Sequence, residues 1–212
     1  MFRSIRSPEV LLTTLAAAGI LMVTMGARQS LGLFVAPINE STSLGIVTIS
    51  LALAVGQFTW GAMQPVAGAV ADRYGPRAVL ITGLVVLAIG SALTPFMTSG
   101  IGLIVSLGLL SAMGAGAGSF SVLIGAAAQR MPLEARGTAS GVINAGGSFG
   151  QFVFAPIIQK LISLFGWMGA MWSLALLTLT ALPLVGKLTR PGAAPPKHAE
   201  ADAGLKNTVV GA

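Results

Sequence analysis

The feature that most constrains this chain is a series of long apolar runs with almost no charged residues. Charged residues make up 8% of its 212 residues and hydrophobic residues 54%, whereas soluble domains carry roughly 25% charged residues. The runs are long enough to cross ~30 Å of hydrocarbon, which takes about 20 helical residues. They are continuously apolar, whereas the strands of membrane barrels alternate between apolar and polar residues. The sequence therefore predicts an all-α integral membrane protein.

The apolar runs predict six transmembrane helices separated by short polar or Gly- and Pro-containing turns. If six helices alternate in direction, every loop with Lys or Arg falls on one side of the membrane. Because positive residues mark the cytoplasmic side, this bias predicts that both termini are cytoplasmic, in a multi-pass protein of the cell inner membrane. The predicted spans are Val10–Ala36, Ile46–Ala71, Ala78–Phe96, Ile101–Ala128, Thr138–Leu161 and Trp167–Lys187.

Three loops on the opposite side support this orientation, because Asn39–Gly45, Met97–Gly100 and Ser163–Gly166 contain no Lys or Arg. Residues 1–188 thus form the predicted membrane bundle. Residues 189–212 are rich in Pro, small and charged residues and lack apolar periodicity. They are predicted to be a disordered cytoplasmic tail or the start of a central loop.

A short internal similarity relates the second and fifth predicted helices. Gly56–Phe58 and Gly150–Phe152 share the sequence Gly-Gln-Phe and precede Tyr74–Gly75 and Phe165–Gly166 at nearly the same distance. Pro65 and Pro156 lie between these points in each helix. Correspondence between helices two and five is expected of a 3+3 inverted repeat. Chance resemblance between Gly- and Phe-rich helices is the alternative.

A charged motif occupies the predicted cytoplasmic turn between helices two and three. It consists of Gly68, Asp72, Arg73, Gly75 and Arg77. Gly68 would let another backbone approach helix two, and Gly75 can adopt the positive φ of a tight turn. Asp72 would be stabilised opposite the N-terminus of a neighbouring helix. The alternative is a charged turn that only orients the hairpin.

This motif, its place after the second helix and the helix number resemble the major facilitator superfamily over Pro8 to Lys187. Gly26–Pro37 looks like the first helix of bacterial members akin to monocarboxylate and oxalate/formate carriers. The resemblance implies alternating access by two six-helix bundles, of which this chain is the amino-terminal one, with the charged motif as a cytoplasmic gate. Drug/proton antiporters carry an arginine motif in helix four, which is absent here. Either the chain is half of a transporter, or six-helix chains pair as a homodimer.

Polar residues inside the spans are the candidate substrate-binding residues. Arg28 lies well inside the first run, where an arginine faces a cavity or a partner, and its guanidinium suits a carboxylate. The alternative is an arginine that extends to the outer interface. Each of the pairs Gln57/Gln64 and Asn144/Gln151 shares a helix face, which either lines a polar path or joins helices. The candidates are Arg28, Gln29, Gln57, Asn144 and Gln151.

Several functional classes are excluded by what the sequence lacks. It has no Cys, its single His is His198 in the predicted tail, and its six acidic residues lie near helix ends, in loops or in termini. No metal site, cofactor or catalytic residue is therefore expected, and the chain is not predicted to be an enzyme. No basic surface interleaved with aromatics suggests nucleic acid.

The sequence predicts a secondary active transporter, or its amino-terminal half, for a small solute that is an organic anion. The alternatives are a truncated non-transporting membrane protein and an efflux carrier for another small molecule. The predicted partners are an anionic small molecule, membrane lipid, and a second six-helix half or a second copy.

Overall fold

The computed structural model describes residues 7–189, and helices joined by short turns account for that range, with no strand. The predicted tail beyond residue 189, and Arg3 and Arg6, lie outside the described residues. The elements in order are α1 (Pro8–Ser30), η2 (Leu31–Phe34), α2 (Val35–Thr42), α3 (Ile46–Tyr74), α4 (Pro76–Leu93), η3 (Thr94–Phe96), α5 (Gly100–Leu103), the π-helix η4 (Ile104–Ser111), α6 (Ala112–Ala117), α7 (Phe120–Ala128), α8 (Leu133–Leu179) and α9 (Leu182–Leu188).

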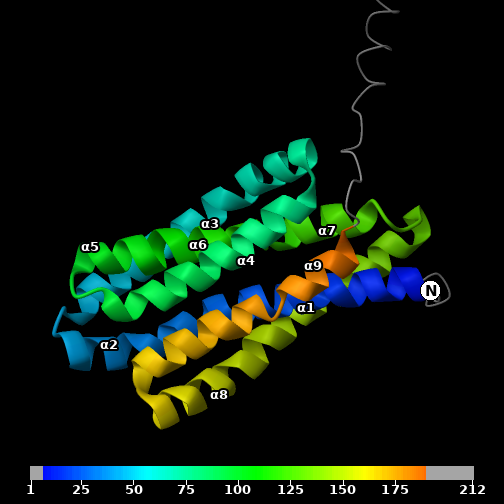
Figure 1. Ribbon diagram of the computed structural model, residues 1–212. Helices are drawn as coiled ribbons and strands as arrows, with labels where there is room; N and C mark the ends of the chain where they lie inside the picture. The colour runs from blue at the N-terminus through cyan, green and yellow to red at the C-terminus, as the bar shows by residue number, and fades with distance from the viewer. Residues whose placement is uncertain (1–6, 190–212) are drawn as a thin grey trace, which may run out of the picture.

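Five helical segments in the described range are long and apolar enough to cross a membrane. The last of them, Leu133–Leu188, has 56 residues and is not a single rod. At Gly166 the backbone leaves the helical region, with φ 67° and ψ 174°. Figure 1 shows that the chain reverses there, so that α8 has a first arm (133–165) and an antiparallel second arm (167–179) that α9 continues.

Two predicted turns are shorter than expected. Asn39–Gly45 was expected to be a loop, but α2 continues to Thr42. In Ser163–Gly166 only Gly166 leaves the helix, because a residue without a Cβ can adopt a positive φ at little cost.

The turns that connect the helices lie at two opposite ends of the bundle (Figure 1). One end, called here the Gly75 end, carries the α3–α4 turn, the start of α1, the α7–α8 connection and the end of α9. The opposite end, called the far end, carries the α2–α3 and η3–α5 connections and the break in α8. The described basic residues at the Gly75 end are Arg73, Arg77, Arg130, Arg136 and Lys187.

The first arm of α8 packs against α1 at backbone distance. A Cβ added to Gly146 would lie 2.7 Å from the Ala18 carbonyl oxygen, and one added to Gly150 would collide with the Met22 carbonyl. Gly146 and Gly150 are four residues apart, which places both on one face of the helix. Small residues at this spacing let membrane helices approach closely, where van der Waals packing replaces the hydrophobic effect.

A second close interface joins α4 to α6. A Cβ on Gly83 would lie 3.0 Å from the Gly114 carbonyl oxygen, and one on Gly114 would collide with the backbone of Gly83 and Leu87. The second arm of α8 also meets α4, where the Trp172 indole N–H donates to the Ala92 carbonyl at 3.2 Å.

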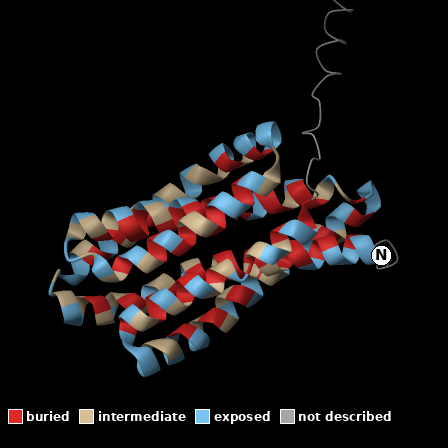
Figure 2. Ribbon diagram, in the orientation of Figure 1, coloured by how far each residue is buried: buried red, intermediate tan, exposed pale blue. Residues whose placement is uncertain are grey.

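The helix α3 lies at the margin of the bundle. In the apolar 18-residue window of α3, 11% of the residues are buried. In the corresponding window of the segment Pro8–Thr42, 67% are buried. Figure 2 shows the contrast, with buried residues concentrated between the other helices and exposed ones along the α3 segment that leads to Tyr74. One side of α3 therefore faces either lipid or a partner.

We expect Gly150→Leu to destabilise the bundle, because the added side chain meets the α1 backbone, which cannot move aside as a side chain can. Overpacking of this kind costs about 1–3 kcal/mol of unfolding free energy. Gly141→Leu, at an exposed position with nothing within 4 Å of the added Cβ, is the matched control. Unfolding by denaturing detergent in mixed micelles measures both, and equal stability of the two variants would contradict the packing described.

Candidate functional site

The centre of the candidate site is the Arg28 side chain in the last turn of α1. Its Nη2 group donates a hydrogen bond to the Gln57 side-chain oxygen. Its Cζ atom lies 4.0 Å from the centroid of the Trp60 ring, a distance at which the aromatic face attracts a cation. Gln57 and Trp60 are three residues apart and share one face of α3. The arginine is thus held between two adjacent groups of the neighbouring helix.

The cluster of Arg28, Gln57 and Trp60 lies deep within the span of α3. Gln57 is 11 residues from Ile46 and 17 residues from Tyr74, so it lies about 17 Å from one helix end and about 26 Å from the other. An arginine at the membrane surface would direct its guanidinium towards a helix end. The contacts of Arg28 point instead to the middle of α3.

The positive charge of Arg28 has no acidic partner within the described residues. It contacts a neutral amide, that of Gln57, and the aromatic ring of Trp60, and no described carboxylate forms a salt bridge with it. A charge in the middle of a membrane is costly unless a partner or water is at hand. The half-buried guanidinium therefore retains the capacity to bind an anion.

A helix break lies next to this cluster. The helix α6 ends at Ala117, Gly118 and Ser119 form a turn, and α7 begins at Phe120. The Thr24 hydroxyl, one helical turn before Arg28 on α1, donates to the Gly118 carbonyl at 3.1 Å. The first N–H groups of any helix lack intrahelical acceptors, so the break adds polar backbone groups to the region of α1 that contains Thr24.

The structure brings together only part of the predicted site. Arg28 and Gln57 are in contact, whereas Gln29 is exposed. Asn144 is exposed and Gln151 half-buried, both on the first arm of α8. Neither forms a side-chain hydrogen bond with another described residue, so they do not join helices within this part of the chain.

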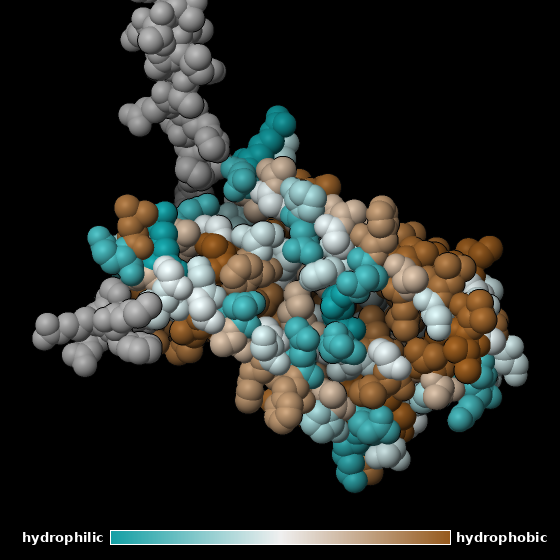
Figure 3. Space-filling model, turned by 180° about the vertical axis from the view of Figure 1, so that it is seen from behind, coloured by the Kyte–Doolittle hydropathy of each residue, from teal (hydrophilic) through white to brown (hydrophobic). Residues whose placement is uncertain are grey.

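The surface of the bundle is polar in places where lipid would demand apolar side chains. Figure 3 shows hydrophilic side chains gathered across the middle of the face opposite to that of Figure 1, while hydrophobic side chains cover most of the far end. Exposed polar residues within the spans include Gln57, Asn144 and Ser148. A surface of this kind fits contact with water, solute or another polypeptide better than contact with hydrocarbon.

The charged motif lies at the Gly75 end, where α3 turns into α4. Gly75 has φ 90° and ψ 146°, which confirms the predicted positive φ. No other described helix lies within 4 Å of a Cβ added to Gly68, so the close approach of another backbone there stays a prediction. A helical glycine serves close packing only where a second helix faces it, and α3 is marginal at this point.

The charges of the motif are exposed and available. Asp72 and Arg73 are exposed and Arg77 is half-buried. The Arg73 Cζ atom lies 5.3 Å from the centroid of the Tyr74 ring. Asp72 forms neither an ion pair nor a side-chain hydrogen bond with a described residue, so its contact with the N-terminus of a neighbouring helix stays a prediction.

Trp60 and Thr24 are site residues that the sequence analysis missed. Trp60 lies three residues after Gln57 and Thr24 four residues before Arg28, so helical spacing from the two candidates could have indicated both. The Trp60 indole nitrogen is buried without a hydrogen-bond partner in the described residues, which is uncommon for a buried donor.

Comparison with known proteins is consistent with this architecture. The model of the Major Facilitator Superfamily matches residues 17–210. Monocarboxylate transporter 13 of Rattus norvegicus is 33% identical over 173 residues, which cover 80% of this chain and 39% of that protein. Monocarboxylate transporter 11 of Homo sapiens is 33% identical over 199 residues, 90% of this chain and 41% of that protein.

A bacterial relative is more distant. The probable sulfoacetate transporter SauU of Cupriavidus necator is 30% identical over 126 residues, 58% of this chain and 29% of that protein. The chain spans about two fifths of the length of the monocarboxylate transporters it matches. All these relatives are named as transporters and none as an enzyme, which supports a non-enzymatic function. The chain is a multi-pass membrane protein and belongs to the major facilitator superfamily.

Proposed function

We propose that this chain is the amino-terminal half of a secondary transporter that carries a small organic anion by alternating access. The observation that supports this most directly is the Arg28 guanidinium, held at mid-helix by Gln57 and Trp60 with no described carboxylate to neutralise it. The monocarboxylate and sulfoacetate transporters are related proteins whose named substrates are anions. A carboxylate or sulfonate would provide the missing countercharge.

In this proposal the anion replaces the Gln57 side chain as a hydrogen-bond partner of Arg28. The guanidinium can turn from the Gln57 oxygen to a carboxylate and form two parallel hydrogen bonds, which are stronger than those to a neutral amide. Gln29, Asn144 and Gln151 would line the same polar path on α1 and α8. The exposure of Gln29 and Asn144, and the partial exposure of Gln151, support that role.

We also propose that the bundle consists of six membrane-crossing helices arranged as a 3+3 inverted repeat. The break at Gly166 divides the last segment in two. The repeated glycines make equivalent contacts: Gly150 meets the Met22 backbone, and a Cβ on Gly56 would lie 3.4 Å from the Leu107 carbonyl oxygen. Each repeated glycine thus packs against the backbone of a helix from the other half of the bundle, as a repeat that pairs helix five with one and helix two with four requires.

The Gly75 end is proposed to face the cytoplasm of a bacterial inner membrane, with both termini on that side. The basic residues that gather at this end support the orientation. There Asp72, Arg73 and Arg77 would form a gate against a second six-helix half, or a second copy of this chain. Residues 189–212 would begin the connection to that half.

Arg28→Ala should abolish most anion transport, because loss of a charged hydrogen bond costs about 1.5–3 kcal/mol, or roughly a tenfold or greater loss of rate. Uptake of radiolabelled short-chain monocarboxylates and of sulfoacetate into proteoliposomes measures it. Arg136→Ala, which removes an exposed arginine at the start of α8, is the control and should transport as the wild type does. An Arg28→Ala protein with unchanged anion flux would refute the assignment of the site.

Binding can be measured without flux through Trp60. An anion that draws the Arg28 guanidinium away from the indole ring should change the Trp60 fluorescence of purified protein. We expect a saturable change in the wild type that is lost in both Trp60→Phe and Arg28→Ala. A response that persists in Trp60→Phe would come from Trp167 or Trp172, the other tryptophans of the sequence, and would place the ligand elsewhere.

The topology can be tested with single cysteines, because the natural chain has none. We expect Thr98→Cys and Ser163→Cys, at the far end, to react with a membrane-impermeant maleimide in intact cells. Leu133→Cys, at the Gly75 end, should react only after permeabilisation. Labelling of position 133 from outside would reverse the proposed orientation, and opposite results for positions 98 and 163 would exclude six crossings.

A further inference from the structure

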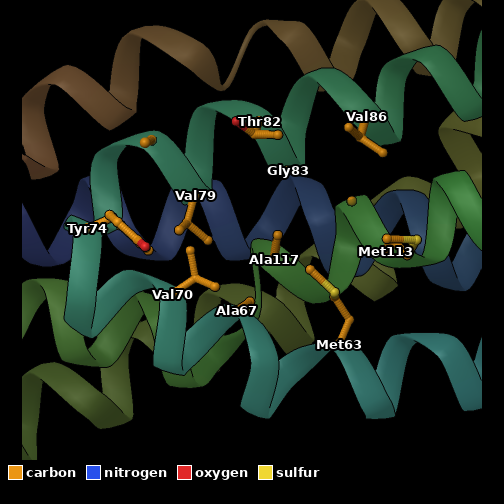
Figure 4. Close-up of a pocket in the computed structure, with 12 residues that line it drawn as sticks. Met63, Ala67, Val70, Tyr74, Val79, Thr82, Gly83, Val86, Met113 and Ala117 are labelled. Carbon is orange, nitrogen blue, oxygen red and sulfur yellow. The ribbon is translucent and has the colours of Figure 1, made fainter.

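A cavity of about 380 Å³ lies between α3, α4 and α6, separate from the Arg28 cluster. Figure 4 shows Ala67 and Val70 on α3, Val79 on α4 and Ala117 on α6 directed towards the space between the helices. Gly83 on α4 and Gly114 on α6 also line the cavity, at the point where these two helices are in close contact.

The cavity has the length of one lipid leaflet. Its wall on α4 runs from Ala78 to Val86, which corresponds to about 12 Å of helix. Half of a ~30 Å hydrocarbon core is about 15 Å. The cavity begins beside Tyr74 at the Gly75 end and reaches the level of Met113, so it extends from one membrane surface towards the midplane.

The cavity is apolar and open to the outside of the bundle. Among the side chains that line it, only Tyr74 and Thr82 carry a hydroxyl group. Val70 and Met113 are 38% and 39% exposed, so the space opens to the surface of the bundle. Water is a poor occupant because it needs two to four polar partners, whereas hydrocarbon needs none.

Positive charge lies at the mouth of the cavity. The Arg73 guanidinium lies over the ring of Tyr74, which lines the cavity. Arg77 precedes the lining residue Ala78 on the first turn of α4. Asp72 offsets one of the two positive charges, so the turn keeps a net positive charge. Arginine binds phosphate through its planar set of donors, and juxtamembrane basic residues attract anionic lipids.

We infer that this cavity binds one acyl chain of an anionic phospholipid whose phosphate contacts Arg73 and Arg77. The inference rests on the membrane topology proposed above, and it does not depend on the anion site at Arg28. The lipid fills the gap between α3 and α4 next to the charged motif, so that the motif is bound to the membrane surface. Both the apolar length and the charge at its mouth are needed for this ligand.

Photo-crosslinking tests the acyl-chain site. Purified protein is placed in phosphatidylcholine nanodiscs that contain a phosphatidylglycerol with a diazirine in one acyl chain, and labelled peptides are identified by mass spectrometry. We expect the label to concentrate on residues 63–86 and 113–117. Val70→Trp fills the cavity and should remove most of this labelling. Val66→Trp, one turn away at an exposed position that does not line the cavity, should leave it unchanged.

The charge requirement is tested by competition. Unlabelled phosphatidylglycerol should displace the probe better than phosphatidylcholine does, by roughly fivefold for each arginine that contacts the headgroup. Arg73→Gln with Arg77→Gln should remove this preference, whereas Arg136→Gln should retain it. Soluble glycerol phosphate should not compete, because the acyl chain is absent.

Three results would overturn the inference. The first is labelling spread evenly over all helices, and the second is equal labelling of Val70→Trp and Val66→Trp. The third is crosslinking of residues 63–86 to polypeptide instead of lipid, which would show that a partner helix fills the cavity. Both leaflets of the nanodisc have the same composition, so the labelling is independent of orientation. A failed transport or topology test would therefore leave this result interpretable by itself.

Discussion

The architecture depends on close backbone-to-backbone packing of helices through glycine. Lipid tails are as apolar as the side chains that they surround, so burial of apolar surface adds little to helix association in a membrane. Gly146 and Gly150 bring the first arm of α8 against α1, and Gly83 and Gly114 join α4 to α6. These contacts fix how α1 lies against α8 and how α4 lies against α6.

The arginine cluster and the lipid cavity illustrate two ways in which this packing leaves room for ligands. At Arg28 the helices α1 and α3 are close enough for the guanidinium to contact both Gln57 and Trp60. Between α3, α4 and α6 the helices enclose an apolar space instead. The Arg28 cluster carries a positive charge with no described carboxylate beside it, whereas the cavity is lined almost entirely by apolar side chains. The two proposed ligands, a small anion and a lipid chain, match this difference.

Much of the helical organisation could be predicted from the sequence, because apolar run length and charge position are local properties. The turn at Gly75 was predictable for the same reason, since glycine is the residue that tolerates its φ of 90°. The absence of a close contact at Gly68 within the described residues could not be predicted, because the role of a helical glycine depends on whether another helix faces it. Trp60 was missed because its role depends on the approach of α1 to α3. Asn144 and Gln151 share a predicted face with the spacing of Gln57 and Gln64, yet spacing alone could not show whether they form hydrogen bonds with another described helix.

Because the chain reverses sharply at Gly166, the far end of the bundle has little chain that projects beyond the helices. The connections at that end consist of three non-helical residues at 43–45, three at 97–99 and the single residue Gly166. Proteases cleave, and antibodies bind, extended segments that project beyond a fold, and the described chain presents almost none on this side. A solute that approaches from there meets helix ends directly, with no covering domain built from residues 7–189 to select or delay it.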